Sequence, residues 1–452
     1  MNKTDWNQKA VEELEDFLKN KIVLPGTEKY AVSYQGWAAT DNRPAMICLC
    51  ETTEDVQAAV VLAQKKNIRL SVRGGGHDWQ GRAFADGGLV ADLTKINTIE
   101  IDAAAKTAVV GGGTKIIDLT TAAGKFDLVH VTPPSGEVGI TGFTLGGGYG
   151  LISPSCGMAA DNLLSAEVVL ANGSLVVASP TENEDLLWAL RGGGGNFGVV
   201  TSLIIRLHPA KPLLAGRIMF GLSEAKNILK GYNEIMKSAP DELYVLIQAM
   251  SGPDGKPVLM AVPNWFGDPE EGQHYIDAFR QLGTPIREQI SQVTVQGLLE
   301  SFAPFIVNGR RVYTKTRWLS ELQPGLIDGI AEAIHHKTSP LSVVALLEVH
   351  GATTKVAVAD TAFGLRDRHF VLLIGAEWIP EEDATSEQHK KWVNDLYEMA
   401  APFSLPGGYA TMLGSENDEQ VRHAYGSNLP QLRLVKQKYD PNGIFTGIPL
   451  GL

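Results

Sequence analysis

Residues 71–81 read Ser-Val-Arg-Gly-Gly-Gly-His-Asp-Trp-Gln-Gly. A strand-like run from Ile68 to Val72 ends at three glycines, and His77 follows them directly. Because glycine has no Cβ, such a loop can adopt positive φ and approach a ligand closely. A histidine after a glycine turn is often only an exposed loop residue. Next to a ligand-binding loop it can also reach whatever the loop holds, so His77 is the first candidate functional residue.

The elements around this loop predict a mixed α and β fold. Residues 45–50 and 68–73 resemble strands on either side of a helix that Thr52 and Asp55 begin, which is the pattern of a βαβ unit. Further strands are expected at 89–93, 98–101, 107–110, 167–170, 174–178 and 199–207, and helices at 115–124 and after a Thr181–Glu184 capping box. Farther along, helices at 223–237, 269–282, 324–337 and 385–401 alternate with strands at 243–250, 257–263, 312–318, 342–350 and 370–378. This second region is typical of a sheet covered by helices on one side.

The composition excludes several classes of protein. A chain of 452 residues predicts two domains or one interrupted domain. A net charge of −12 argues against nucleic acid and anionic membranes as partners. Three cysteines are too few for a disulfide framework, ten scattered histidines show no metal-ligand spacing, and no signal peptide or long apolar run is visible. We therefore expect a soluble cytoplasmic protein without a metal site.

Glycine is concentrated in four clusters, at 74–76, 111–113, 146–148 and 192–195. The last cluster contributes to a G-x-G-x-x-G motif, but the motif follows a predicted helix and precedes a strand. A dinucleotide-binding fingerprint requires the reverse order, so that interpretation fails. Each cluster alone is consistent with a tight turn. Several glycine loops together can also supply backbone N–H groups to one extended anionic ligand.

Five blocks occur in one order along the chain. They are Arg73–His77, Pro134–Gly150, Gly157–Asn162, Arg191–Gly198 and Tyr439-Asp440-Pro441. Together the blocks resemble the berberine bridge enzyme-like FAD-linked oxidases of the vanillyl-alcohol oxidase superfamily. The resemblance implies an α+β fold, with a two-subdomain FAD-binding domain and a substrate domain whose antiparallel sheet is covered by helices. It divides the chain into an FAD-binding domain at 1–210, a substrate-binding domain at 211–410, and a C-terminal segment at 411–452 that returns to the FAD domain.

The resemblance also assigns cofactor contacts. His77 matches the family histidine that is bonded covalently to the flavin 8α-methyl group. Many members add a second bond through a cysteine, but this chain has Ser135 there, and a hydroxyl does not replace a thiolate in this linkage. We therefore expect one covalent bond, through His77, and interpret Cys156 as structural or at most a neighbour of the flavin. The candidate cofactor-binding residues are Arg73, Gly74, Gly75, Gly76, His77, Asp78, Gly81, Ser135, Gly136, Val138, Gly139, Thr141, Gly142, Gly146, Gly147, Tyr149, Gly150, Gly198, Val200 and Asn442.

The expected chemistry is oxidation of a small organic alcohol or amine by hydride transfer to flavin N5, with O₂ or another acceptor and with hydrogen peroxide if O₂ accepts. A base must take the O–H or N–H proton. Glu348 and His350 are candidates because they share one face of an apolar strand, where ionisable groups are costly unless exposed or used. Tyr313, on another strand, and Tyr409, which aligns with a family tyrosine, are further candidates. Each can instead be a solvated or structurally hydrogen-bonded residue.

Two other interpretations remain. The flavin can serve a cyclase or an oxygenating tailoring enzyme of secondary metabolism, or the glycines can be mere turns in a binding protein. The expected partners are a small-molecule substrate and an electron acceptor, in a monomer or homodimer.

Overall fold

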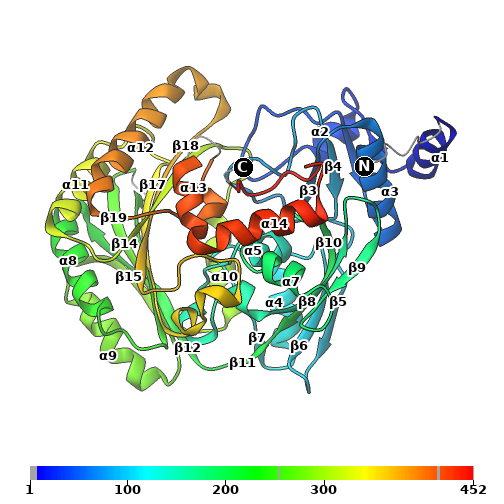
Figure 1. The fold of residues 1–452 in the computed structure, drawn as a ribbon. Coiled ribbons are helices and arrows are strands. Elements are labelled where there is room, and N and C mark those ends of the chain that lie inside the picture. The colour runs from blue at the N-terminus through cyan, green and yellow to red at the C-terminus, as the bar shows by residue number, and fades with distance from the viewer. Residues whose placement is uncertain (1–7, 253–254, 415–417, 451–452) are drawn as a thin grey trace.

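The structure is a computed structural model that describes residues 8–252, 255–414 and 418–450. Figure 1 shows two parts side by side: the N-terminal strands with the end of the chain, and a large sheet with its helices at the outer edge. The first part ends at β11 (His208–Pro209) and the large sheet begins at β12 (Leu213–Gly221). Of the domain boundaries that we propose, 1–210, 211–410 and 411–452, the first falls between β11 and β12, and the second falls within the 3-10 turn η8 (Ala410–Met412).

A small sheet positions the glycine loop at residues 74–76. Its strand order is β1-β2-β4-β3, with β1 (Ile22–Val23), β2 (Met46–Leu49), β4 (Leu89–Asp92) and β3 (Leu70–Arg73). Strands β2 and β3 both run parallel to β4, which lies between them. The predicted βαβ unit through α3 (Thr53–Lys66) is therefore present, with one strand inserted, and the Thr52–Asp55 capping box is confirmed. Helices α1 (Gln8–Leu18) and α2 (Glu28–Ser33) complete this end of the chain.

A second, antiparallel sheet has the order β5-β6-β10-β8-β9. Its strands are β5 (Ile99–Asp102), β6 (Thr107–Gly111), β10 (Val199–Arg206), β8 (Leu163–Val169) and β9 (Leu175–Ala178). The strands predicted at 98–101 and 107–110 pair as the antiparallel hairpin β5–β6, and those predicted at 167–170 and 174–178 pair as β8–β9. Between β6 and β8 lie α4 (Ile116–Gly124), β7 (Leu128–Val129), α5 (Ile140–Leu145), α6 (Ser153–Cys156) and the 3-10 turn η1 (Ala159–Asn162). Helix α7 (Glu184–Leu190) lies between β9 and β10. The predicted Thr181–Glu184 capping box is wrong, because α7 begins after Asn183, whose φ is +49° and whose side chain donates to Val177 O instead.

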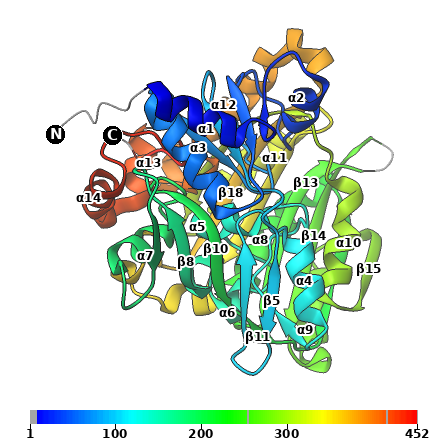
Figure 2. The ribbon, with the colours of Figure 1, turned by 90° about the vertical axis from the view of Figure 1, so that its right-hand side faces the viewer.

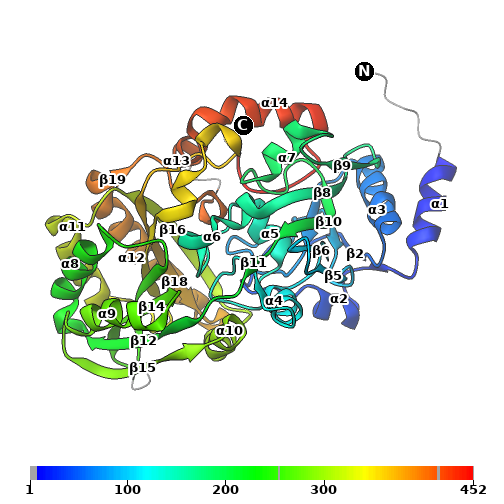
Figure 3. The same cartoon turned by 90° about the horizontal axis from the view of Figure 1, so that it is seen from below.

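The large sheet is antiparallel, with the order β15-β12-β14-β13-β17-β18-β16-β19. Besides β12 it contains β13 (Leu243–Ser251), β14 (Pro257–Phe266), β15 (Pro285–Val293), β16 (Arg311–Leu319), β17 (Val343–Val349), β18 (His369–Trp378) and β19 (Ser404–Leu405). Helices α8 (Ala225–Met236), α9 (Pro269–Arg280), α11 (Pro324–His335) and α12 (Ser386–Ala400) pack on one face. Figure 3 shows α8 and α11 on the outer side of this sheet and the N-terminal part beyond its other side. The sequence pattern predicts these four helices but not β12 and β15.

Side-chain alternation separates the two faces of the large sheet. On β13, Leu243, Val245 and Ile247 join the apolar core beneath the helices. Their neighbours Tyr244 and Leu246 point to the N-terminal part, where a second apolar core continues. Helix α10 (Val295–Phe302) belongs to that second core and lies beside α4 (Figure 2). The face without helices is therefore the face that can contact a ligand held by the glycine loops.

The end of the chain returns to β3. Helices α13 (Asp418–Tyr425) and α14 (Leu429–Tyr439) are followed by Asp440, whose carboxylate accepts hydrogen bonds from the backbone N–H groups of Ile444 and Phe445. Leu70 N donates to Ile444 O at 2.7 Å, so the tail pairs with β3 itself. In Figure 1, α14 crosses the middle of the view toward β3.

Candidate active site

Two glycine loops meet backbone to backbone beyond the end of β3. A Cβ atom on Gly75 would lie 2.2 Å from Gly139 N, and one on Gly139 would lie 2.3 Å from Gly75 N. Any other residue would force the loops apart, so this sequence is required for the contact. Thr141 donates a hydrogen bond to Gly112 O at 2.8 Å, which ties in a third glycine cluster. The result is a surface of exposed backbone that a ligand can approach closely.

His77 lies beside this surface with both ring nitrogens unsatisfied. Nδ1 and Nε2 are buried and have no hydrogen-bond partner among the described residues. The ring stacks on Trp37, with centroids 4.8 Å apart and planes at 12°. Burial lowers the pKa of His77 to about 4, so the imidazole is neutral at neutral pH. Buried polar atoms are nearly always paired, so an orphaned imidazole indicates a missing ligand.

A cavity of about 520 Å³ separates the glycine loops from the large sheet. The size is typical of a small-molecule or cofactor site. One wall is formed by the glycine loops and His77, and the opposite wall by β12, β13, β14, β17 and β18. Residues 74–76, Gly112 and Gly194–Gly195 all line it. Three of the four glycine clusters therefore converge on one space.

The cofactor candidates divide into two groups. Those that line the cavity are Gly74, Gly75, Gly76, His77, Asp78, Ser135, Val138, Gly139, Thr141, Gly142, Tyr149, Gly198 and Val200. Those that do not line it are Arg73, Gly81, Gly136, Gly146, Gly147, Gly150 and Asn442.

Of the residues that do not line the cavity, some hold the glycine loops or the C-terminal segment in place, and Asn442 lies apart from the site. Arg73 donates to Asp92 Oδ2 at 2.9 Å and to Ser33 O at 2.8 Å, which anchors the start of the loop. A Cβ on Gly146 would lie 2.2 Å from Thr411 Cγ2, so Gly146 permits close packing of the C-terminal segment. Asn442 is exposed to solvent. The resemblance pointed to Asn442, but the neighbouring Asp440 makes the turn's hydrogen bonds.

Tyr409 is the one predicted catalytic residue that lines the cavity. Its hydroxyl accepts a hydrogen bond from Gly148 N at 3.2 Å, and its ring lies 4.8 Å from that of Tyr149. The Tyr149 hydroxyl lies 3.0 Å from His369 Nε2. Because His369 Nδ1 must donate to the Asp367 carbonyl, Nε2 is the acceptor and Tyr149 the donor.

Glu348 and His350 lie outside the cavity, contrary to the expectation that they face a substrate. Val343, Ala345 and Leu347 line the cavity, so the alternating Glu348 points to the opposite face of β17. There its carboxylate contacts His350 Nδ1 and Arg368, and His350 Nε2 lies 3.1 Å from Pro240 O. The sequence therefore identified two buried polar side chains that contact each other, but they lie on the helix side of the sheet.

Tyr313 also lies away from the cavity. Its hydroxyl donates to Asn394 Oδ1 of α12 at 3.1 Å, and the residue lines a smaller, polar pocket of about 360 Å³. The neighbouring Thr316 points the other way, since its hydroxyl accepts the Tyr409 backbone N–H. Strand alternation again accounts for the difference from the expectation.

An acid that the sequence reading missed lies in the cavity wall. Glu377 of β18 shares its face with the lining residues Val371 and Leu373 and is itself a lining residue. Arg310 donates to its Oε2 at 3.0 Å, and the carboxylate is 10 % exposed. Burial raises the pKa of Glu377, and Arg310 opposes that rise. Its signal was an acid in an apolar strand, the same signal that drew attention to Glu348.

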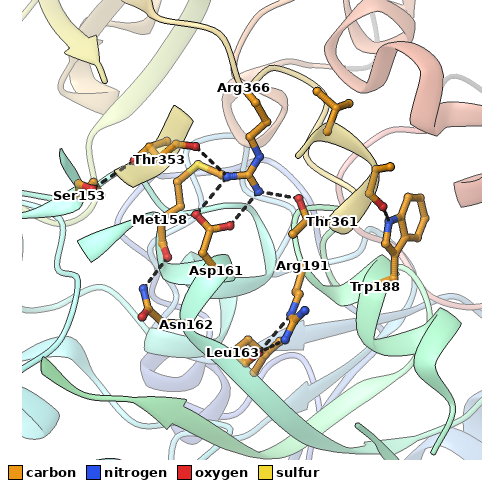
Figure 4. A network of polar contacts seen from close by, with 12 residues as sticks. Ser153, Met158, Asp161, Asn162, Leu163, Trp188, Arg191, Thr353, Thr361 and Arg366 are labelled. Carbon is orange, nitrogen blue, oxygen red and sulfur yellow. Dashed lines mark hydrogen bonds and ion pairs between the residues drawn. The ribbon is translucent and has the colours of Figure 1, made fainter. Parts of the chain in front are cut away.

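A buried ionic network fastens the loop between β17 and β18 to the N-terminal part (Figure 4). Arg366 donates to Asp161 Oδ1 at 2.8 Å and to Asp161 Oδ2 at 3.0 Å. The same guanidinium donates to Thr361 Oγ1 and the Thr353 carbonyl, and Trp188 Nε1 donates to Ala359 O at 2.8 Å. Asp161 belongs to a block that the sequence reading attached to the flavin core. In the structure it ties the loop between β17 and β18 to the N-terminal part.

Within residues 8–252, 255–414 and 418–450, no group of three His, Cys, Asp or Glu side chains could hold a metal ion. In the same ranges no helix is long and apolar enough to cross a membrane.

Comparison with known proteins finds two matching family models. "FAD binding domain" matches residues 44–179, and "Berberine and berberine like" matches residues 412–447. The chain is 34 % identical to (R)-6-hydroxynicotine oxidase of Paenarthrobacter nicotinovorans over 61 % of each chain. It is 28 % identical to xylooligosaccharide oxidase of Thermothelomyces thermophilus, over 96 % of this chain and 93 % of the relative.

A solved structure shows the same similarity in three dimensions. The crystal structure of 6-hydroxy-D-nicotine oxidase from Arthrobacter nicotinovorans superposes with a TM-score of 0.85 at 27 % identity, over 94 % of this chain and 96 % of that one. The glycine loops, the cavity and the tail that returns to β3 therefore lie within a fold shared by both chains.

Proposed function

We propose that this chain, a member of the berberine bridge enzyme-like FAD-linked oxidoreductases, holds its FAD through one covalent bond at His77 and oxidises a small alcohol or amine. The observation that carries the covalent part is the buried His77 ring with two unpartnered nitrogens. A neutral imidazole has the lone pair that such a bond needs, and burial keeps His77 neutral.

The residues of the cavity fit an extended anionic cofactor. The backbone of residues 74–76 and Gly139 would hold it, since these glycines line the cavity and their lack of a Cβ lets a ligand approach their amides. Ser135 lines the cavity with a buried hydroxyl that has no partner in the described chain. A serine there offers no thiolate, which supports a single covalent bond.

FAD held in this cavity would supply a hydride acceptor, with electron transfer onward to O₂ or another acceptor. The protein must orient the substrate and take its O–H or N–H proton. We assign the role of the base that accepts this proton to Glu377. It is the buried carboxylate of the cavity wall, and Arg310 stabilises its charged form. Tyr409 borders the same space and contributes to substrate orientation.

The proposed substrate class rests on the similarity of this chain to two oxidases. A hydroxynicotine oxidase and a xylooligosaccharide oxidase support oxidation of an amine or alcohol, and their being oxidases supports O₂ as acceptor with hydrogen peroxide as product. The free cysteines Cys48, Cys50 and Cys156 are consistent with the cytoplasmic location that we propose. A monomer or homodimer is proposed with it.

The test of the covalent bond is acid precipitation of purified protein, followed by flavin fluorescence of the denaturing-gel band and mass analysis of the peptide that contains His77. We expect the flavin to stay with the wild-type chain and to be lost from the band in His77→Ala. The control is His336→Ala, since that side chain is 72 % exposed and forms only a surface pair. Complete release of flavin from wild type by acid would refute the bond.

The reaction itself is tested by anaerobic bleaching of the flavin with alcohols, amines, sugars and phenols. Bleaching reports reduction whatever the acceptor is. Oxygen uptake and peroxide yield with a bleaching substrate then separate an oxidase from a cyclase or an oxygenating enzyme. An oxidase gives about one peroxide per product, as stoichiometry requires.

A further inference from the structure

One wall of the cavity carries a guanidinium that no carboxylate neutralises. Arg217 of β12 lines the cavity and donates through Nη2 to Ser301 O at 2.6 Å and Ser301 Oγ at 3.1 Å. Both are neutral acceptors, and no ion pair to Arg217 occurs within the described ranges of the chain. The other charged groups of the lining are paired, Arg82 with Asp78 and Arg310 with Glu377. The cavity therefore carries one uncompensated positive charge.

The surroundings of this guanidinium are apolar. Its central carbon lies 4.7 Å from the ring centroid of Phe302 and 4.9 Å from that of Phe305. Burial lowers the pKa of Arg217, but an arginine stays charged at any physiological pH. Stacking on aromatic rings orients the planar group while its unused N–H donors stay available. A partly desolvated cation of this kind favours an anionic ligand, above all one with two oxygens.

Arg217 lies far from the proposed reacting groups. Strand β12 is separated from β18, which carries Glu377, by β14, β13 and β17. Neighbouring strands are about 4.8 Å apart, so the four steps amount to roughly 19 Å across the sheet. The wall between them is mostly apolar and includes Met260, Leu246 and Leu347. An anion at Arg217 would thus mark the end of a ligand whose body crosses an apolar surface.

The rim near Arg217 has the same character. Phe305 and Val307 line the cavity although they are 51 % and 43 % exposed. Exposed apolar side chains at a cavity are typical of a ligand-binding surface.

We propose that Arg217 binds the carboxylate of an otherwise apolar substrate, at the end remote from Glu377. This inference rests on the proposed function, because it names the class of substrate: an apolar alcohol or amine that bears a carboxylate. It assigns Arg217 to binding and specificity, with no part in the chemical step.

The test compares two probes of the same shape, phenylacetate and phenylacetamide, by calorimetric titration of the flavin-containing protein. We expect phenylacetate to bind at least ten times more tightly, and its dissociation constant to increase with salt while that of the amide does not. Arg217→Met removes the preference, and Arg217→Lys keeps part of it because the charge remains but the bidentate geometry is lost. Arg280→Gln is the matched control, since Arg280 pairs with Glu288 and Asp277 on the surface.

Three results would overturn the inference. The two probes could bind wild type equally, or the preference could survive in Arg217→Met. Alternatively, Arg217→Met could lose flavin relative to Arg217→Lys, which would assign the guanidinium to the cofactor instead. If Arg217→Met does not fold, the probe ratio and its salt dependence in wild type decide. These measurements need neither turnover nor the covalent bond, so the inference and the proposed function can fail separately.

Discussion

The buried Asp161–Arg366 pair gives a quantitative test of how the loop between β17 and β18 is held to the N-terminal part. The side chains are 9 % and 3 % exposed, and Arg366 donates two charge-assisted hydrogen bonds to Asp161. Asp161→Asn removes one charge and leaves the guanidinium buried without its counter-ion. Breaking a buried pair in this way costs about 3–5 kcal/mol.

The expected shift in melting temperature follows from the size of the chain. The entropy of unfolding is about 2.1 cal/mol/K per residue, so a chain of 452 residues changes by about 0.95 kcal/mol per degree if it unfolds as one unit. Asp161→Asn should therefore lower the melting temperature by about 3–5 °C. Thermal unfolding, followed by intrinsic and flavin fluorescence at one scan rate, measures the shift.

The control and the double variant make the test specific. Asp395→Asn removes a surface partner of Lys391, where both side chains are more than half exposed, and should shift the melting temperature by less than about 1 °C. Arg366→Met combined with Asp161→Asn should cost less than the sum of the single changes, because no unpaired charge remains. A loss below about 1 °C for Asp161→Asn, or strict additivity in the double variant, would refute this account of the pair.

Three further predictions concern the glycine loops that contact each other at Gly75 and Gly139, the proposed base Glu377, and stability at acid pH. Gly75→Ala places a Cβ 2.2 Å from a backbone nitrogen and should sharply lower the flavin-to-protein ratio. Gly124→Ala, whose Cβ has nothing within 4 Å, should keep that ratio. Equal ratios in the two variants would contradict the role of the glycine loops in holding the cofactor. Glu377→Gln should lower kcat/KM by about 10²–10⁴. The wild-type acid limb should lie above the ordinary glutamate range, since burial raises this pKa and a base acts deprotonated; an unchanged profile in the variant would exclude Glu377. Burial lowers the pKa of His369 to about 4, so between about pH 6.5 and pH 4 the unfolded chain binds a proton that the folded chain does not. The melting temperature should therefore fall as the pH drops through that window. The fall should be smaller in His369→Asn, which lacks the titrating group.

Local patterns in the sequence predicted much of the fold. The two hairpins, helix α4 and the helices of the large sheet depend on residues close together in the chain, such as the capping pair Thr52 and Asp55. The failed capping box at Thr181 shows the limit of such reasoning, because Asn183 adopts a left-handed conformation that the pattern does not reveal. The insertion of β4 between β2 and β3 is likewise a choice between pairings that sequence alternation leaves equal.

The glycine loops, the position of His77 and the acids in apolar strands are all evident from the sequence. Backbone freedom, and the cost of burying charge, are properties of individual residues. Which face of the large sheet meets the glycine loops depends on how the two parts of the chain pack together. That choice places Glu348 and His350 with the helices, Glu377 in the cavity with Arg310, and Arg217 on the wall without a counter-ion. Alternation fixes which residues share a face, but the identity of the partner across that face depends on segments hundreds of residues apart.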